Sequence, residues 1–409
     1  MLAVANEYTK RGFVVAAIDG SKHGDRSWCS ADNQCKGGAA GSCLKIAGGA
    51  NQGDLVAPGI CSTGNLKVFT NCSTPACPGA WAAYTDSDGG PDGYARNSSN
   101  YFVSANFFRT RDTLRQDLID QSALILALAR PPASAALPDI PAANKALLGY
   151  LLQGKGIYID PAHINWAGQS LGAILGTLNL AANPRLSRGV LNVGGGTLTD
   201  ILTTAPAFQS SVGGLLASLG IVPGTPAYLQ FLLVAKWILD PADPINAAGH
   251  LLGGASKATL PDLLAGQPNQ VAKSIYGQFA ACDQTVPNVF NIGLYGNIGL
   301  TPLGVTTQRP NAAMTMFLDV GPASPTNTCP DANKPYSIPV PGVGYAAVPH
   351  AFITNRGAAA SFDAGGNLTG FTTNTTIHSL AQAAGDLGAA FLLDPVTNLP
   401  PTAVAFPQP

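Results

Sequence analysis

The sequence predicts an α/β fold in which a mostly parallel β-sheet carries helices on both faces. Short apolar runs along the chain are separated by stretches with helical spacing, and this alternation is typical of parallel strands joined by crossover helices. One run, residues 13–18, is continuously apolar, as expected of a strand that is buried on both faces. The composition agrees with a large folded core, because 46% of the residues are hydrophobic and only 11% are charged.

The charged side chains nearly cancel. The 409 residues include 22 lysines and arginines against 23 aspartates and glutamates, which gives a formal net charge of −1. A protein that binds nucleic acid through its phosphates needs a basic excess, so we exclude an electrostatic nucleic-acid binder. No apolar run reaches the about 18 residues that would make a transmembrane segment. The best one, residues 228–239, is shorter and contains Lys236.

The first elements are expected to be a helix over residues 1–11 and a buried strand over residues 13–18. Gly12 suits the position after a helix, where the backbone adopts a positive φ. Residues 13–18 are apolar without interruption, which favours a strand. A helix that leads into a buried strand is an unusual beginning for an open α/β sheet. We therefore expect the N-terminal strands of the sheet to be missing from this chain.

Residues 20–100 show little periodicity, and we interpret them as a Cys-rich loop insertion. Six of the eight cysteines fall in it: Cys29, Cys35, Cys43, Cys61, Cys72 and Cys77. Close Cys-x-x-Cys pairs are absent, so we favour disulfide bonds in an oxidising compartment, with metal ligation and reduced thiols as the alternatives. Residues 1–8 lack the basic segment and apolar core of a signal peptide. We therefore expect a secreted or periplasmic protein whose natural N-terminus lies upstream.

The rest of the chain is expected to supply the remaining strands and helices. An amphipathic pattern predicts a helix over residues 107–129. Strands are expected over residues 164–167, 189–193, 274–279 and 314–320, and helices over residues 147–152, 171–182 and 376–393. Residues 198–265 are rich in Leu, Ala, Gly and Pro with almost no alternation, which predicts several short helices with an exposed apolar side.

A candidate nucleophile follows the strand over residues 164–167. Residues 168–172 read Gly-Gln-Ser-Leu-Gly, and a helix is expected directly after them. In this strand–turn–helix context a G-x-S-x-G sequence places the serine on a sharp turn at the carboxyl end of the sheet. Ser170 is therefore the candidate nucleophile, and the alternative is a glycine-flanked serine in a tight turn.

A serine hydroxyl becomes a good nucleophile only when a base removes its proton, so a histidine is required. His350 lies in a late loop and fits the chain order serine, acid, histidine of this architecture. His378, near the start of the last helix, is the alternative. His23 and His163 are expected to orient turns or to lie structurally at the sheet edge.

The acid is expected in a loop between the serine and the histidine. Asp283 directly follows the strand over residues 274–279, and a buried aspartate there would fix the histidine tautomer and stabilise the imidazolium. The rivals are Asp200, Asp240, Asp243 and Asp319, of which Asp240 and Asp243 precede prolines and are interpreted as caps or turns. A disulfide between Cys282 and Cys329 would tie the acid loop to the base loop.

Several segments resemble the extracellular bacterial lipases, often called virulence-factor lipases, of the α/β-hydrolase superfamily. They are residues 111–116 (Arg-Asp-Thr-Leu-Arg-Gln), residues 160–163 (Asp-Pro-Ala-His) with 168–172, residues 240–246 (Asp-Pro-Ala-Asp-Pro-Ile-Asn) and residues 283–288 (Asp-Gln-Thr-Val-Pro-Asn). The resemblance implies an α/β-hydrolase core over residues 1–197 and 266–409 and a helical cap or lid over residues 198–265. It also implies a secreted carboxylic-ester hydrolase with Ser170 as nucleophile, Asp283 as acid and His350 as base.

The chain departs from these lipases in two places. In the family a His-Gly motif before the first helix supplies a second oxyanion donor, but here the chain opens at the helix. The backbone N–H of Leu171 is the donor that the sequence identifies. The second departure is Ala351, where the family more often has glycine after the histidine.

The expected reaction is acyl transfer from an ester to water. We expect Gln169, Phe208, Leu232 and Trp237 to contact the substrate, which is expected to carry an acyl or aromatic group. For the apolar residues the alternative is ordinary packing on the sheet. We expect no cofactor and no metal. Two other functions stay open: a polyester hydrolase acting on insoluble polymer, and a catalytically impaired hydrolase-like protein that binds a lipid or a partner.

Overall fold

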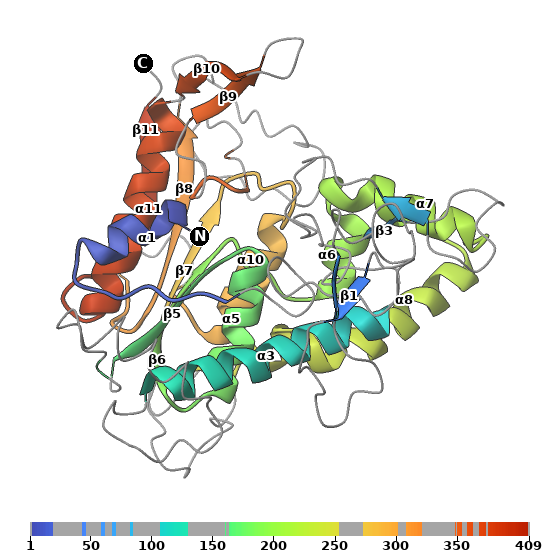
Figure 1. The fold of residues 1–409 in the computed structure, drawn as a ribbon, viewed down its shortest axis with the longest axis horizontal. Coiled ribbons are helices and arrows are strands. Elements are labelled where there is room, and N and C mark those ends of the chain that lie inside the picture. The colour runs from blue at the N-terminus through green and yellow to red at the C-terminus, as the bar shows by residue number, and fades with distance from the viewer. Residues whose placement is uncertain are drawn as a thin grey trace. The chain divides into compact units, whose positions relative to one another are not determined.

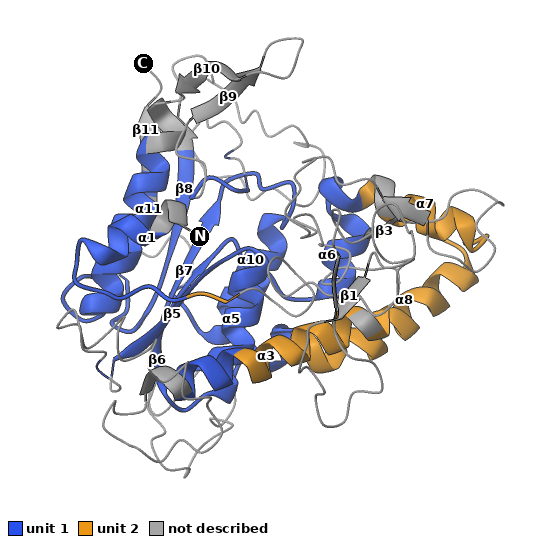
Figure 2. Cartoon of the chain, viewed as in Figure 1, with its two compact units in different colours: residues 1–16, 121–208, 243–409 blue, residues 17–120, 209–242 orange. Residues whose placement is uncertain are grey.

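The computed structural model describes residues 2–18, 43–45, 59–61, 68–70, 82–84, 107–129, 160, 163–252, 273–301, 308–320, 348, 350–353, 358–362, 368–373 and 375–407. The chain divides into two compact units (Figure 2). The first comprises residues 1–16, 121–208 and 243–409, and the second comprises residues 17–120 and 209–242. The division into a hydrolase core and a cap over residues 198–265 stays a prediction.

A parallel sheet lies in the first unit (Figure 1). Its strands are β5 (Ile164–Gln169), β6 (Leu186–Asn192), β7 (Ser274–Ala280), β8 (Ala312–Val320) and β11 (Ala403–Pro407), in the spatial order β11-β8-β7-β6-β5. All four neighbouring pairs run parallel, and β7 is buried along its whole length. The predicted α/β class with a parallel sheet is confirmed, so the carboxyl ends of these strands meet at one edge.

One face of the sheet is covered by α5 (Leu171–Ala182) and α10 (Asn288–Ile298). The helices pack closely over two glycines of the strands beneath. A Cβ on Gly189 of β6 would lie 2.4 Å from a methyl of Leu180, and one on Gly277 of β7 would lie 2.9 Å from the Tyr295 ring.

The opposite face is covered by α11 (Thr375–Leu393). Phe391 of this helix contacts Tyr276 of β7 with ring centroids 5.4 Å apart. α1 (Leu2–Thr9) packs against α11, and Tyr8 joins the same buried cluster as Phe391 and Tyr276. Because neighbouring residues of a strand point to opposite faces, Tyr276 and Gly277 meet different helices, and helices cover both faces as predicted.

Short helices occupy residues 198–252, as predicted for this part of the chain. They are α6 (Leu198–Thr204), η4 (Pro206–Phe208), α7 (Gln209–Ser218), α8 (Pro226–Leu239), η5 (Asp240–Ala242) and α9 (Ile245–Ala248). α8 begins where the Thr225 hydroxyl accepts a hydrogen bond from the Tyr228 N–H at 3.3 Å. Its residues Leu229, Leu233 and Trp237 are 58%, 71% and 74% exposed. At i, i+4 and i+8 they form an apolar stripe on the helix surface.

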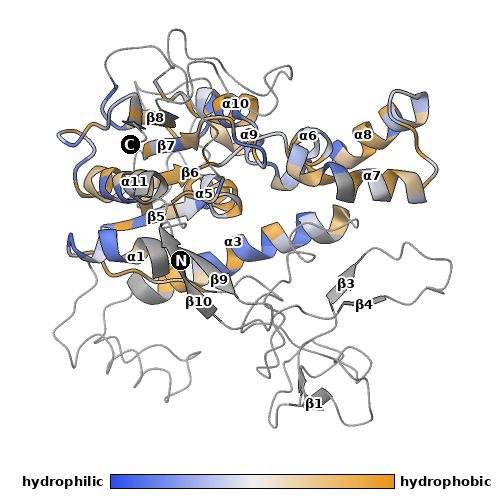
Figure 3. Ribbon diagram, turned by 90° about the horizontal axis from the view of Figure 1, so that it is seen from above, coloured by the Kyte–Doolittle hydropathy of each residue, from blue (hydrophilic) through white to orange (hydrophobic). Residues whose placement is uncertain are grey.

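The structure also contains the long helix α3 and three small antiparallel sheets. α3 (Phe107–Ala129) has the predicted bounds, and polar and apolar residues alternate along it (Figure 3). In the second unit Phe231 of α8 contacts Phe107 of α3, with centroids 5.8 Å apart. Three two-stranded antiparallel sheets pair β1 (Cys43–Lys45) with β2 (Gly59–Cys61), β3 (Val68–Thr70) with β4 (Ala82–Tyr84), and β9 (Ala358–Phe362) with β10 (Leu368–Thr373). The helix predicted over residues 147–152 lies outside the described residues.

The strand predicted over residues 13–18 is wrong. Gly12 adopts φ +84° after α1, as expected, and Phe13 then packs on Tyr8 with centroids 6.3 Å apart. The segment forms no strand, and Val14 and Val15 are 48% and 39% exposed. No described strand pairs with it, and an apolar run without a pairing partner leaves its backbone groups to water.

Candidate active site

The candidate nucleophile lies on a sharp turn between β5 and α5. Ser170 has φ 55° and ψ −118°, a conformation that a residue with a side chain rarely adopts and that marks functional turns. A Cβ on Gly168 would lie 2.1 Å from the Gly172 carbonyl oxygen, so only glycine fits there. The Trp166 indole N–H donates to the same oxygen at 2.9 Å. These contacts fix the first turn of α5 against the end of β5 and hold the serine at the carboxyl end of the sheet.

Ser170, His350 and Asp283 form one hydrogen-bonded chain. His350 Nε2 lies 2.6 Å from Ser170 Oγ, and His350 Nδ1 lies 2.7 Å from Asp283 Oδ2. The Asp283 side chain is fully buried, and that of His350 is 14% exposed. The structure therefore brings together the three residues that the sequence analysis selected, all within the first unit.

The Asp283 carboxylate is oriented by its own loop. Its Oδ1 accepts the backbone N–H groups of Thr285 and Val286 at 2.8 and 2.9 Å. These two bonds leave Oδ2 directed at the imidazole, where it accepts the Nδ1–H of His350 if that nitrogen carries the proton.

The turn before Asp283 is held in a strained conformation. Cys282 has φ 59°, and its N–H donates to Asn288 Oδ1 at 3.0 Å. The Asn288 amide in turn donates to the Ala280 carbonyl oxygen at 2.7 Å. Cys282 also takes part in a disulfide bond. Its suggested partner Cys329 lies outside the described residues, so that pairing stays a prediction.

The His350 loop is anchored to the acid loop and to the core. The Val348 N–H donates to the Ala281 carbonyl oxygen at 3.0 Å. Phe352 and Ile353 are buried in a cluster that includes Phe317 of β8. Their burial fixes the backbone on the C-terminal side of the histidine.

A buried polar network lies under the site, and sequence reasoning missed it. The Tyr295 hydroxyl donates to the carbonyl oxygens of Leu191 and Gln278, at 2.7 and 3.0 Å, and accepts the Gly194 N–H. The two bonds from one hydroxyl are a shared, three-centre arrangement. Burial raises the pKa of the Tyr295 hydroxyl well above its ordinary value, so the hydroxyl remains a donor. In the sequence Tyr295 is an aromatic residue at helical spacing, a pattern that predicts core packing and does not reveal its hydrogen bonds.

The remaining predicted contacts are distributed over both units. The Leu171 N–H is the first amide of α5, where helix N–H groups have no partner within the helix. Gln169 Nε2 donates to the His350 carbonyl oxygen at 3.3 Å. Phe208 packs on the cluster that includes Val286, next to the acid loop. Leu232 and Trp237 belong to α8 in the second unit, and their contact with substrate stays a prediction.

The rival residues have other surroundings. Asp243 accepts the N–H groups of Thr197 and Leu198 at 3.0 and 2.6 Å, at the start of α6, which agrees with the predicted capping role. His163 pairs with Asp160 at 2.6 Å before β5 begins, at the far end of the sheet from Ser170. His23 and the side chains of Asp319 and His378 lie outside the described residues.

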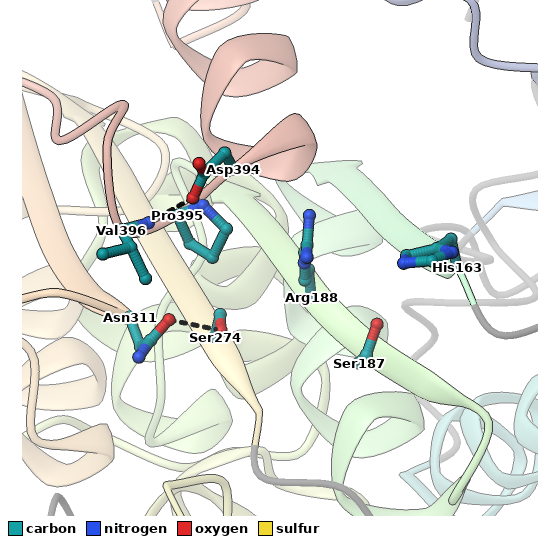
Figure 4. A pocket seen from close by; sticks show the side chains of 8 residues that line it. All are labelled: His163, Ser187, Arg188, Ser274, Asn311, Asp394, Pro395 and Val396. Atoms are coloured by element: carbon teal, nitrogen blue, oxygen red, sulfur yellow. Dashed lines mark hydrogen bonds between the residues drawn. The ribbon is translucent and has the colours of Figure 1, made fainter.

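A pocket lies at the amino-terminal ends of the strands (Figure 4). Its lining residues are His163, Ser187, Arg188, Ser274, Asn311, Asp394, Pro395 and Val396. Arg188 donates to the carbonyl oxygens of Leu392 and Leu393 at the end of α11, where a cation is favourable. We interpret these polar groups as stabilising the end of α11, remote from the triad.

The described ranges show neither a metal centre nor a membrane span. Across them, His, Cys, Asp and Glu side chains do not gather in groups of three or more as metal ligands would. None of the helices in these ranges is long and apolar enough to cross a membrane.

The chain is distantly similar in structure to known proteins. No family model matches the sequence, and no curated protein matches it. Among solved structures, a puromycin-hydrolyzing peptidase of Mycobacterium tuberculosis matches with a TM-score of 0.25 and 16% sequence identity. The match covers 43% of this chain and 20% of the peptidase chain.

Proposed function

We propose that this protein is a serine hydrolase of the α/β-hydrolase type that cleaves carboxylic esters, in the manner of a lipase or esterase. The observation that carries the proposal is the unbroken hydrogen-bonded chain from Ser170 Oγ through the His350 imidazole to Asp283. The strained backbone at Ser170 supports it, because such strain is retained where the surrounding structure holds a reactive group in position.

In the proposed acylation step Ser170 Oγ attacks the ester carbonyl carbon while His350 Nε2 takes the hydroxyl proton. The Leu171 N–H at the start of α5 donates to the oxyanion that forms. The tetrahedral intermediate then expels the alcohol, which receives its proton from the imidazolium. Asp283 stabilises the imidazolium and keeps Nε2 directed at the serine.

Deacylation repeats these steps with water. His350 removes a proton from a water molecule as its oxygen attacks the acyl-enzyme, and the proton returns to Ser170 Oγ when the acid leaves. In this scheme the chain supplies the Ser170, His350 and Asp283 side chains and the Leu171 N–H, and one water molecule is consumed for each ester bond cleaved.

We propose an acyl or aromatic substrate, as the apolar composition of residues 198–265 suggests. Leu233 and Trp237 are among the most exposed large apolar side chains of the described residues. An exposed apolar stripe also favours a substrate presented on a surface, so an insoluble polyester is the second candidate. The disulfide bond at Cys282 supports an oxidising compartment, which agrees with our proposal of a secreted bacterial enzyme of the lipase group.

The test is hydrolysis of p-nitrophenyl esters of increasing acyl length by wild type and Ser170→Ala. We expect turnover by wild type and a loss of about 10⁶-fold in kcat in the variant. Turnover that is equal in both proteins, or absent from both, would contradict the proposal. To separate the two substrate classes, the rate at which soluble products leave a polyester film is compared with the rate of hydrolysis of the soluble esters.

A further inference from the structure

We propose that Gln169 is a positioning residue for the base, which ties the His350 loop to the nucleophile strand. The inference rests on the proposed function and assigns Gln169 a role other than the substrate contact expected from sequence. Gln169 is the last residue of β5, and its Nε2 donates to the His350 carbonyl oxygen at 3.3 Å. Its backbone is held by pairing with Asn192, whose carbonyl oxygen accepts the Ser170 N–H at 2.8 Å.

The hydrogen bond matters because the triad joins segments that are far apart in sequence. Ser170 and His350 are 180 residues apart. The other contacts of the His350 loop described above lead to the acid loop, through Val348, and to the core beside β8, through Phe352. The Gln169 amide reaches the base loop from the nucleophile strand and does not involve the reacting groups.

A backbone held at this carbonyl oxygen fixes the distance between Nε2 and Oγ before any proton moves. Small displacements of a general base reduce the rate steeply, because proton transfer needs hydrogen-bond geometry in the reacting complex. A positioning role therefore predicts an effect on kcat with little effect on KM. A substrate contact that binds the ground state predicts the opposite, an increase in KM at unchanged kcat.

The test compares Gln169→Met and Gln169→Glu with wild type in ester hydrolysis. Methionine keeps the length of the side chain and removes the donor, and we expect kcat to fall about tenfold with KM unchanged within about twofold. Glutamate places a carboxylate against the carbonyl oxygen, and we expect a larger fall in kcat. Gln116→Met is the matched control, because Gln116 is exposed on α3 and its amide donates to Asp120 one turn along the same helix. This substitution should leave kcat unchanged.

A second readout does not depend on turnover. In the proposed mechanism His350 Nδ1 carries a proton that it donates to Asp283. This proton should give a low-field proton NMR signal, identified by its loss in Asp283→Asn. We expect this signal to broaden through solvent exchange in Gln169→Met and to stay sharp in Gln116→Met. Unchanged kcat and an unchanged signal would overturn the positioning role, and a raised KM alone would return Gln169 to the substrate. If wild type lacks ester turnover, the proposed function fails, and the NMR comparison still decides the role of Gln169.

Discussion

Replacing Asp283 with asparagine perturbs the proposed mechanism with little change of shape. The carboxylate accepts two backbone N–H groups on Oδ1 and faces His350 Nδ1 with Oδ2. An asparagine that keeps its oxygen toward the two N–H groups turns its NH₂ toward the imidazole. His350 Nδ1 then accepts, Nε2 carries the proton, and the ring can no longer take the proton of Ser170. The opposite orientation would set two backbone donors against the NH₂ group, at about 1–3 kcal/mol for each unsatisfied group.

We therefore expect Asp283→Asn to fold with near-normal stability and to lose about 10⁴-fold in kcat, the loss known when a triad histidine is held in the wrong tautomer. The assay is p-nitrophenyl ester hydrolysis, with thermal unfolding followed by circular dichroism. Asp200→Asn is the matched control. Asp200 is a rival acid in the first turn of α6. Its substitution should lower the free energy of unfolding by no more than about 1 kcal/mol and should leave kcat unchanged. An Asp283→Asn protein that keeps a tenth or more of the wild-type kcat would refute the role of Asp283 in setting the tautomer of His350.

Other predictions follow from the packing of the site and the core. Gly168→Ala should lower both ester turnover and the melting temperature, because the new Cβ would lie 2.1 Å from a backbone oxygen of α5; normal activity would show that the turn yields. Tyr295→Phe should lower the free energy of unfolding by about 1–3 kcal/mol in urea titrations, since it leaves a buried N–H without its acceptor; a smaller loss would mean that water replaces the hydroxyl. Burial raises the pKa of Tyr8, Tyr276 and Tyr295, so above about pH 10 the unfolded state loses protons that the folded state keeps. Stability should then fall by about 1.4 kcal/mol per pH unit for each tyrosine, and tyrosinate absorbance of these groups should rise only with unfolding; earlier ionisation would contradict their burial.

The sequence predicted the central strands well because each combines apolar residues with a helical stretch on either side. β5 to β8 are short segments separated by helices, and each was expected within a few residues of its observed bounds. β11 was not expected, because Ala403–Pro407 is short, ends in proline and pairs on one side with β8. The error at residues 13–18 has the opposite cause. An apolar run shows a tendency to be buried, but pairing depends on which strand lies beside it.

The candidate site divides in the same way. The turn at Ser170 was predictable because glycine at position 168 is a local requirement of the close approach to α5. Asp283 and His350 were selected from chain order, and their distances depend on how two remote loops fold. Gln169 was expected to contact substrate because it adjoins the nucleophile. Its hydrogen bond to a residue 181 positions away could not be predicted, since no local pattern shows such a contact.

In the proposed mechanism Ser170 is a nucleophile activated by His350 and Asp283. The most direct measurement is the reaction of the protein with a fluorophosphonate, followed by peptide mapping by mass spectrometry. We predict one adduct per chain, on the peptide that contains Ser170, formed much more slowly in Asp283→Asn and absent from Ser170→Ala. No adduct on wild type, or an adduct on another residue that persists in Ser170→Ala, would contradict the claim.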